Sequence, residues 1–589
     1  MVYTNITVEI PKNCKEKKTS AKSKKKYIYL YLGTKREKGS KYPKPELLQI
    51  GTYIDENKMH PNDNYYTHFK KEKPEFIVLD TSKPHKVVDY GPFFFLDKII
   101  KDLKIDEISN NIFNEDISKV LLTMVMYLLT DTVMKNIDVW CKKNYHYLDR
   151  PINSQRASEY FAQIQEYAEQ WQKDWLFYAN EKNGVAIDST SISSYSDNIA
   201  FLEWGHSKEN NDLAQVNFMM AFGKESKLPL CYQIIPGSIT DKTSFNKAKQ
   251  HFENLGLIID RYTFDRGFFD INNLKLMGKE DKFVCPVYDN FELLRSKLSL
   301  YANGMQRSVN IIDTMSWKCE DNDTIYGITI PYKFDDDDLK DIDYNVHLFY
   351  SNIRSALKKA SLLQKVKLEE EFINKLSNHA YLTNTQIKHL QSMKYFVCEL
   401  ENNDIVTKLK TYEKRHDLID DEMSKMGYFA FITNDLSVTP KDALEWYATR
   451  NDVEVAFNDL KNNLDFKRLG TQTQLTANGK LFVGFISLII KMQINKLLNQ
   501  YRLKYRQSTP SAKKQMSNFA NKSALDLPRE LSLITVQEIN KEKYWLNTET
   551  NKKCKEILSM VNLTKEDLEK SIHILHPYTD SDNSDVNHV

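Results

Sequence analysis

The rhythm of the sequence changes twice, and this change constrains the fold more than any other feature. Residues 184–290 alternate short apolar runs, which are typical of strands, with segments of helical periodicity. Their order is strand, strand, strand, helix, strand, helix, which is typical of a mixed α/β sheet. Residues 291–427 break this pattern, and it resumes at 428–500. The sequence therefore predicts an α/β core that an inserted, partly β domain interrupts.

A chain of 589 residues is too long for a single hydrophobic core, so we expect several domains. The additions to the core are mainly helical, apart from strand-like runs near the N-terminus. The predicted regions are a basic arm with a small strand-rich module at 1–95, a helical candidate DNA-binding domain at 96–183, the first part of the core at 184–290, the insertion at 291–427, the second part of the core at 428–500, and a C-terminal helical region with an acidic tail at 501–589.

The composition is that of a soluble protein, with 41% hydrophobic and 28% charged residues. The net charge is only +2, so an acidic partner must be met by local patches. The seven cysteines never form a CxxC pair, which argues against a disulfide framework or a zinc knuckle and fits a reducing compartment. The start lacks a signal-peptide pattern, and the longest apolar stretches cover about half a membrane span. We therefore expect a cytoplasmic protein that does not enter a membrane.

Basic residues gather at the N-terminus, where residues 12–26 hold eight Lys and one Glu. Two interpretations stay open for this segment: a solvated flexible arm, or an arm that contacts phosphates without sequence preference. Arg is scarce, with 14 among the 82 basic residues. Each Arg is therefore noticeable, because Arg alone offers a rigid fork for phosphate.

Two aspartates and one glutamate are the candidate catalytic residues. Asp188 follows the apolar run 185–187, and Asp265 follows the run 261–264. A carboxylate at the end of a buried strand is costly unless something neutralises it. With Glu454, from a helix, these side chains would make an oxygen-rich site suited to Mg²⁺, and two such ions support in-line phosphoryl displacement. The alternative is that each aspartate only initiates a loop or caps a helix.

A polar stripe surrounds the candidate glutamate in the predicted helix 447–461. At about 100° per residue, Tyr447, Arg450, Glu454 and Lys461 fall within roughly 60° of one another. Apolar residues occupy the neighbouring arc, so the stripe borders the core face, where side chains emerge into a cleft. The other interpretation is a solvated face with an incidental Arg–Glu pair.

Other acidic residues are weaker candidates for the same roles. Asp260 precedes its strand, Asp270 lies inside the next helix, and Asp241 is placed to cap a helix. The acidic run 335–338 lacks the Gly and the spacing of a calcium loop, which favours a solvated loop. His206 has no Cys or His at metal-ligand spacing and is interpreted as a surface residue.

The spacing Tyr447-x2-Arg450-x3-Glu454-x6-Lys461 resembles the signature of the insertion-sequence-4-like DDE transposases. The segments AIDSTSIS and FDRGFFDINNL resemble the first and second aspartate motifs of that group. The 189 positions between Asp265 and Glu454 are similar to the group's β-rich insertion. The layout of the terminal regions most resembles the insertion-sequence-1634 branch.

The resemblance implies an RNase H-like core that moves DNA by cutting and pasting between terminal inverted repeats. It makes Asp188, Asp265 and Glu454 the catalytic ligands of two Mg²⁺ ions, with Mn²⁺ tolerated. It also implies that the Tyr, Arg and Lys of the signature grip phosphates near the cleaved end. The implied partners are double-stranded DNA, both repeats and target, and a second copy in a synaptic complex. Members of the group can use a DNA hairpin intermediate, in which Trp317 is a candidate to stack on a flipped base.

The sequence therefore predicts a DDE transposase in which water cleaves the transposon end and the freed 3′-hydroxyl attacks target DNA. The second hypothesis is an inactive or co-opted DNA-binding protein that retains the fold. The third is an RNase H-like nuclease without strand transfer. A bacterial, nucleoid-associated location follows from the first hypothesis.

Overall fold

The structure, a computed structural model, describes most of the chain. The described residues are 7–18, 26–36, 42–71, 86–131, 133–205, 213–312, 323–377, 379, 381–402, 406–506, 519, 522–539, 543–546 and 550–575. Predictions made for residues 19–25 of the Lys-rich segment, for His206, for Trp317 and for the acidic tail lie outside these residues.

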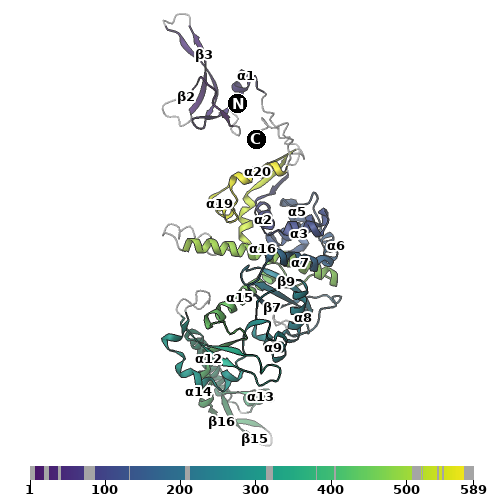
Figure 1. Cartoon of the computed structure of the whole chain (residues 1–589), viewed down its shortest axis with the longest axis vertical. Coiled ribbons are helices and arrows are strands. Elements are labelled where there is room, and N and C mark those ends of the chain that lie inside the picture. Colours follow the sequence, from purple (N-terminus) through teal and green to yellow (C-terminus); the bar gives the residue numbers. More distant parts are fainter. Residues whose placement is uncertain are drawn as a thin grey trace. The chain divides into compact units, whose positions relative to one another are not determined.

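The chain forms two compact units, which are described separately here (Figure 1). The first comprises Met1–Leu96, Cys141–Tyr145 and Asp526–Val589, and the second comprises Asp97–Trp140 and His146–Leu525.

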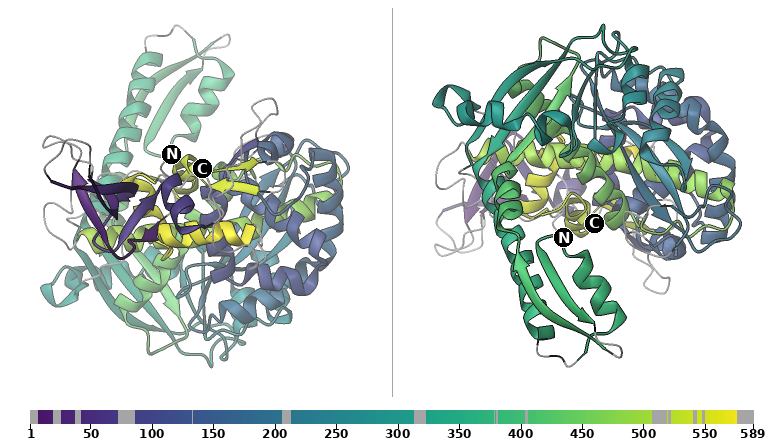
Figure 2. Two further views of the ribbon diagram at one scale, coloured as in Figure 1. Left: turned by 90° about the horizontal axis from the view of Figure 1, so that it is seen from above. Right: turned by 90° about the horizontal axis from the view of Figure 1, so that it is seen from below.

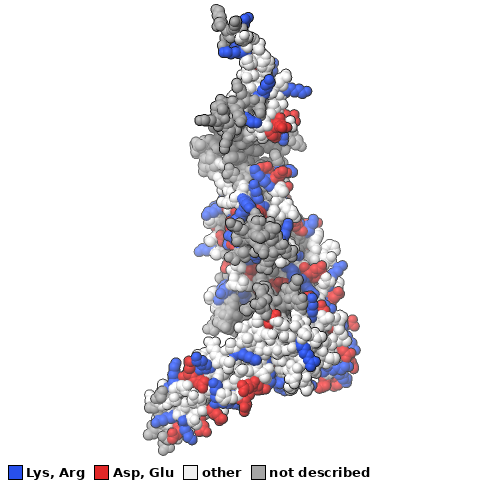
Figure 3. Space-filling model, turned by 90° about the vertical axis from the view of Figure 1, so that its left-hand side faces the viewer, with Lys and Arg blue, Asp and Glu red and all other residues white. Residues whose placement is uncertain are grey.

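The first unit contains an N-terminal antiparallel sheet with the strand order β1-β5-β4-β3-β2. Alternate residues of its strands, such as Ile28 and Leu30, pack against Tyr65 and Tyr66 of the helix that follows. Figure 3 shows more Lys and Arg than Asp and Glu side chains on the described part of this sheet. Its elements are β1 Val8–Glu9, β2 Cys14–Lys18, β3 Lys26–Lys35, β4 Lys44–Tyr53, β5 Lys58–Pro61 and α1 Asp63–Phe69.

A second sheet in this unit joins segments from opposite ends of the sequence. Its order is β19-β18-β6, and all of its pairings are antiparallel. The predicted C-terminal helical region contains the helices α18, α19 and α20 but also two strands, because β18 pairs with β6 more than four hundred positions earlier in the chain. The elements are β6 Lys86–Asp89, α18 Asp526–Glu530, β18 Thr535–Ile539, β19 Lys543–Leu546, α19 Lys552–Ser559 and α20 Lys565–Leu575.

The second unit is built on a mixed sheet with the order β12-β13-β14-β17-β11-β10-β7-β8-β9 within the described residues. The central strands β7, β10 and β11 are parallel, and their outer neighbours are antiparallel. The predicted mixed α/β fold is confirmed. The strands are β7 Val185–Ser193, β8 Gln215–Gly223, β9 Pro229–Pro236, β10 Arg261–Phe264, β11 Lys282–Pro286, β12 Ile311–Ile312, β13 Ile325–Tyr332, β14 Tyr344–Ser351 and β17 Tyr428–Thr433.

Apolar residues cover both faces of this sheet. On one face, Ile187 and Phe264 belong to a core that includes Phe245. On the other face, Phe429 and Phe431 pack against the helix α15. Side chains of a strand point alternately to the two faces of the sheet, so residues two apart, such as Phe429 and Phe431, pack against the same layer. The helices of this layer are α8 Asp241–Asn254, α9 Ile271–Met277, α10 Glu292–Arg295, α11 Leu298–Met305 and α15 Pro440–Asn458.

A long helix, α16, closes the β9 side of the unit together with the helices that precede the sheet. In the described chain α16 is the one single helix with the length and apolar composition of a membrane span, and 78% of its apolar window is buried inside the protein. That burial is what a core helix shows. The helices are α2 Gly91–Asp102, which begins in the first unit, α3 Ile105–Ile112, α4 Glu115–Thr130, α5 Ile137–Lys143, whose last residues belong to the first unit, α6 Ser154–Ile164, α7 Ala168–Ala179 and α16 Gln474–Arg506.

The segment between β14 and β17 forms a substructure with its own small core, which includes Leu362, Ile373 and Phe396. Figure 2 shows its teal and green helix lying beside a two-stranded hairpin. Because β13 and β14 belong to the large sheet, this substructure begins only after β14. Its elements are α12 Asn352–Ser377, α13 Asn384–Ser392, β15 Phe396–Asn402, β16 Thr407–Lys414 and α14 His416–Lys425.

Candidate active site

Asp188 and Asp265 lie side by side on neighbouring parallel strands. The last paired residues of β7 and β10 are Ile187 and Phe264, so each aspartate is the next residue on its strand. Neighbouring strands are about 4.8 Å apart. Both side chains follow the alternation away from the Ile187 face, and therefore toward the face that α15 covers.

The prediction that the first strand ends at Asp188 is wrong. β7 continues to Ser193 because its other edge stays paired with β8 as far as Gln215. Asp188 is thus buried, with 5% of its surface exposed, and its Oδ1 accepts the Ser189 backbone N–H at 2.8 Å. Asp265, at the end of its strand, has a side chain that is 30% exposed.

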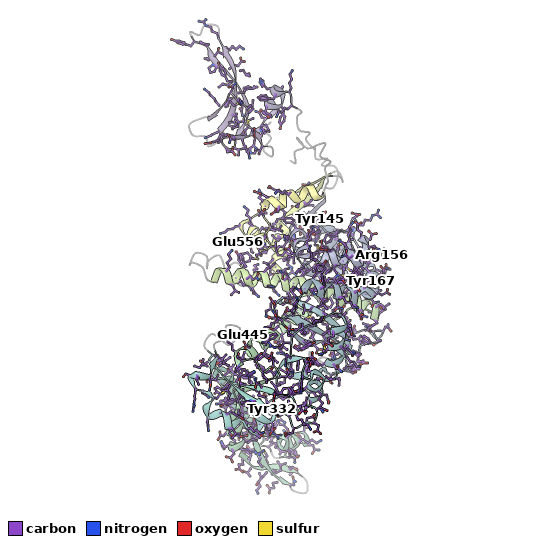
Figure 4. The ribbon with its side chains drawn as sticks, in the orientation of Figure 1. Tyr145, Arg156, Tyr167, Tyr332, Glu445 and Glu556 are labelled. Atoms are coloured by element: carbon purple, nitrogen blue, oxygen red, sulfur yellow. The ribbon has the colours of Figure 1, made fainter. Side chains whose placement is uncertain are left out.

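α15 begins where the sequence provides a strong start signal. Thr439 and Asp442 form a capping box, and Pro440 occupies the first turn. Glu445, labelled in Figure 4, lies in the first half of this helix. Trp446 and other apolar residues on the inner face are buried against the sheet, which fixes how the polar stripe is presented.

The predicted helix through Lys461 ends earlier, and this prediction is corrected. α15 ends at Asn458, and a π-helical turn, Asp459–Asn463, follows. Asp459 is buried, forms an ion pair with Lys491 of α16, and accepts the Asn495 side-chain amide at 2.9 Å. These contacts hold the turn in its wider form, so Lys461 no longer projects at the angle of a continuous α-helix.

Arg450 joins two of the candidate carboxylates. One guanidinium nitrogen donates to Oδ2 of Asp265 at 3.1 Å, and the other lies 2.7 Å from Oε1 of Glu454. The Tyr447 hydroxyl approaches Oδ1 of Asp265 at 3.5 Å, and its ring packs on Phe431 at 4.7 Å between centroids. The structure thus brings Tyr447, Arg450, Glu454 and Asp265 together around one guanidinium.

The electrostatics of the site reflect this arrangement. Burial by itself would lower the pKa of Arg450, but its interactions with Tyr447 and with the negative charges of Asp265, Asp188 and Glu454 outweigh burial, and the pKa is raised. Burial raises the pKa of Tyr447, with the Arg450 charge acting in the opposite direction. The influence of Asp188 on Arg450 places this aspartate within the same electrostatic cluster. Because its pKa is raised, Tyr447 stays a neutral hydrogen-bond donor.

Among the described residues, no group of three or more His, Cys, Asp and Glu side chains is close enough to hold a metal ion. The Arg450 guanidinium stands between Asp265 and Glu454 and supplies the positive charge there. The chemistry of the donor set nevertheless suits a divalent cation, because carboxylate oxygens are the ligands that Mg²⁺ prefers.

The weaker acidic candidates have other roles in the structure. Asp270 caps α9 by accepting the Asn272 N–H at 2.9 Å. Within the acidic run, Asp336 and Asp338 each pair with Lys275 at 2.9 Å. Asp260 lies before β10, at the opposite end of the strand from Asp265.

The family model described as a transposase DDE domain matches residues 179–490. The chain belongs to this family. The match runs from α7 to α16 and so contains the strands and the helix that carry the three carboxylates. This DDE transposase is therefore an enzyme of the nuclease and transposase class.

Two further comparisons were made for the transposase. A search of curated proteins found no match. A solved structure, described as a cryo-EM structure of the piggyBac transposase synaptic complex with hairpin DNA, is similar with 10% identity and a TM-score of 0.32, covering 84% of this chain and 88% of that chain.

Sequence reasoning did not single out two arginines that the structure places near the carboxylates of this transposase. Arg266 directly follows Asp265, and Arg354 lies in the first turn of α12. Burial lowers the pKa of Arg354, the negative charge of Asp289 acts in the opposite direction, and the positive charge of Arg266 lowers the pKa further. The signal in the sequence that could have identified Arg266 and Arg354 was the scarcity of Arg, which makes each one noticeable.

Proposed function

We propose that the transposase cleaves DNA at transposon ends and transfers the freed 3′-hydroxyl strand into target DNA, in a cut-and-paste reaction. The observation that carries the proposal is the register of β7 and β10, which sets Asp188 beside Asp265, combined with the Arg450 bridge from Asp265 to Glu454. The four-residue signature supports placing the chain in the insertion-sequence-4-like group, 1634 branch. The parallel centre of the mixed sheet supports an RNase H-like core.

DDE transposases generally depend on divalent metal ions. We assign Asp188, Asp265 and Glu454 as the catalytic carboxylates that would hold two Mg²⁺ ions, with Mn²⁺ tolerated. When bound, the ions supply activation of the attacking oxygen and stabilisation of the leaving oxygen. The oxygen-only donor set supports this assignment.

The signature residues act on the DNA backbone in this proposal. Arg450 offers a guanidinium fork of the kind that binds phosphate in a bidentate manner, and Lys461 offers a point charge. Tyr447 offers its hydroxyl, which lies 3.5 Å from Oδ1 of Asp265, as a further donor to phosphate, and its ring packs on Phe431. Phosphate binding by Arg450 would take its donors away from Asp265 and Glu454, which frees both carboxylates.

The partner is double-stranded DNA, both terminal inverted repeats and target, and we propose a homodimer in the synaptic complex. The charge of the first 70 residues supports a nucleic-acid partner, since they contain 15 Lys and Arg but 7 Asp and Glu, whereas the whole chain has a net charge of only +2. In the N-terminal sheet, Lys15 of β2 lies opposite Tyr29 of β3, away from the Ile28 core face. Exposed cations beside aromatic rings suit a nucleic-acid surface. A cytoplasmic, nucleoid-associated location follows.

A donor-cleavage assay tests the catalytic assignment. The substrate is a plasmid that carries the gene with its flanking DNA, and the variants are Asp188→Asn and Glu454→Gln. We expect each variant to lose cleavage by about a thousandfold or more, as for groups that act in the transition state. The matched control is Asp452→Asn, which changes an exposed carboxylate of the same helix that pairs with Lys227.

Two outcomes would favour the other hypotheses. Equal cleavage by wild type and both variants would reject the assignment, and absence of cleavage by wild type would favour an inactive DNA-binding protein. Supplying pre-cut ends separates the third hypothesis, because a nuclease without strand transfer would leave these ends unjoined.

A further inference from the structure

Three basic residues lie around a single acidic residue next to the candidate active site. Arg266 and Lys358 approach the same oxygen, Oδ2 of Asp289, at 3.9 and 4.0 Å. Both distances are at the limit of an ion pair, and the Asp289 side chain is 64% exposed, so it neutralises little of either charge. The Asp289 charge also acts on Arg354. The cluster therefore has more positive than negative charge.

Arg354 is held in place without a carboxylate partner. Its guanidinium lies over the Phe429 ring, 4.6 Å from the centroid. Among the described residues its side chain has no ion pair or hydrogen bond, and only its backbone N–H donates, to Ser351 at 3.0 Å. A half-buried guanidinium normally pairs with an acid or a carbonyl group. Here the ring fixes its position while its donors remain available to a ligand.

Packing connects Arg354 to the carboxylate site. Phe429 packs on Phe431 with centroids 5.9 Å apart, and Phe431 packs on Tyr447 at 4.7 Å. Phe429 and Phe431 are on the face of the sheet that α15 covers, and Tyr447 belongs to α15 itself. On the other side of the cluster, Arg266 directly follows Asp265. The cluster is therefore attached to the site through two independent elements, β17 and the loop after β10.

A cavity of about 460 Å³ adjoins the cluster, and Lys358 and Asp289 line it, whereas Arg266 and Arg354 do not. The other charged residues of its lining are Arg295, Lys394, Lys425 and Glu422, so its lining carries more positive than negative charge. Burial lowers the pKa of Lys358, and the neighbouring Arg354 charge lowers it further, which shows that these cations repel each other. An anion that entered the cavity would relieve this repulsion.

We propose that Arg266, Arg354 and Lys358 form a second phosphate-binding cluster, which holds the DNA backbone beyond the phosphate that reacts. The proposal rests on the proposed function, since the ligand is the DNA that the carboxylate site cleaves. Two rigid guanidinium forks and an ammonium group near the one exposed carboxylate of Asp289 match phosphodiester oxygens in chemistry. The cluster makes the substructure that starts at α12 a DNA-binding element and assigns the first two turns of α12 as the contact.

The test is DNA binding by the full-length protein without divalent cations, so that no cleavage occurs. The probe is a fluorescent duplex taken from the DNA that flanks the gene, and binding is measured by anisotropy over a series of salt concentrations. The variants are Lys358→Gln alone and the double variant Arg354→Gln with Lys358→Gln. Each lost phosphate contact should reduce the slope of log affinity against log salt by about 0.9, and the double variant by about 1.8.

Matched controls lie on the same helix. Lys365→Gln and Lys367→Gln remove the same charge from α12 at positions that pair with Glu369 and Glu371. We expect both to keep the wild-type slope. Arg354→Lys should restore the slope but not the full affinity, because it keeps the charge and loses the fork. The Lys358→Gln variant, at a partly exposed position, keeps the test valid if replacing Arg354 disturbs folding.

The outcomes separate this inference from the proposed function. If Lys358→Gln and the double variant keep the wild-type salt slope, the proposed phosphate-binding cluster is wrong. If the Lys365 and Lys367 controls lose as much slope as the cluster variants, the effect is one of general charge, and the proposal is also wrong. Asp188→Asn should bind with the wild-type slope and fail to cleave. If the wild-type protein does not cleave DNA but the cluster variants bind DNA with a reduced salt slope, the proposed function is wrong and the phosphate-binding cluster is supported.

Discussion

Arg450 donates to Oδ2 of Asp265 at 3.1 Å, so a positive charge stands against a carboxylate that is assigned to bind metal. The same guanidinium reaches Glu454 at 2.7 Å. In the proposed function, cation binding by these acids would therefore compete with Arg450. In the presence of DNA, phosphate oxygens offer the guanidinium another partner.

The first prediction concerns this competition. Arg450→Gln should bind Mn²⁺ about fivefold or more tightly in the absence of DNA, since two unit charges about 4 Å apart interact by about 1 kcal/mol even at the dielectric constant of water. Calorimetric titration of the full-length protein measures this affinity. Cleavage by the variant should fall at the same time, because the phosphate fork is lost. Weaker Mn²⁺ binding than in wild type would contradict the competition.

The second prediction concerns the packing of α15 against the sheet. A Cβ at Gly184 would lie 2.2 Å from the Trp446 ring, and Gly184 has φ +146. We expect Gly184→Ala to destabilise the protein by about 1–3 kcal/mol and to reduce cleavage, because Trp446 precedes Arg450 by about one turn. Gly256→Ala is the control, with φ +97 but no atom within 4 Å of the added carbon. Thermal unfolding should show a clearly larger loss for Gly184→Ala.

The third prediction concerns the buried ion pair that holds the π-helical turn. Lys491 and Asp459 have side chains that are 2% and 9% exposed. Lys491→Met should destabilise the protein by about 3–5 kcal/mol, because it leaves a buried carboxylate without its cation. Adding Asp459→Asn to this variant should recover part of the loss. A double variant that is less stable than Lys491→Met would argue against the pair as the cause.

The fourth prediction is a pH dependence of stability. His347 of β14 is fully buried, its Nδ1 lies 3.0 Å from the Thr329 hydroxyl, and burial lowers its pKa from 6.5 to about 4. The unfolded chain thus binds the proton more readily, so stability is fully present above about pH 6.5 and is lost as the pH falls toward 4. The expected contribution is about 3 kcal/mol.

The variant His347→Gln, which cannot titrate, isolates this contribution. Unfolding midpoints of wild type and variant should converge as the pH falls from 7 toward 4, with wild type the more pH-sensitive protein. A constant difference between the two across this range would show that His347 does not cause the pH dependence.

Local patterns in the sequence allowed prediction of much of the fold. The strands around Ile187, Phe222 and Phe431 and the helix that carries Arg450 follow from apolar spacing, because periodicity states which side of an element is buried. Errors arose where a distant partner intervened. β7 runs past Asp188 because β8 pairs with it, and the turn at Asp459 is set by Lys491 on another helix.

The sequence by itself determined the order of the elements, the mixed α/β class and the chemical types available to the site, namely three carboxylates and a scarce arginine. Only the tertiary structure decided that Asp188 follows the same paired position as Asp265, that Arg450 spans Asp265 and Glu454, and that Arg354 rests on Phe429. The physical reason is that the hydrophobic pattern of a helix or strand shows which of its faces is buried but not which other element packs against that face. Contacts between residues far apart in the chain depend on which packing of all elements has the lowest free energy.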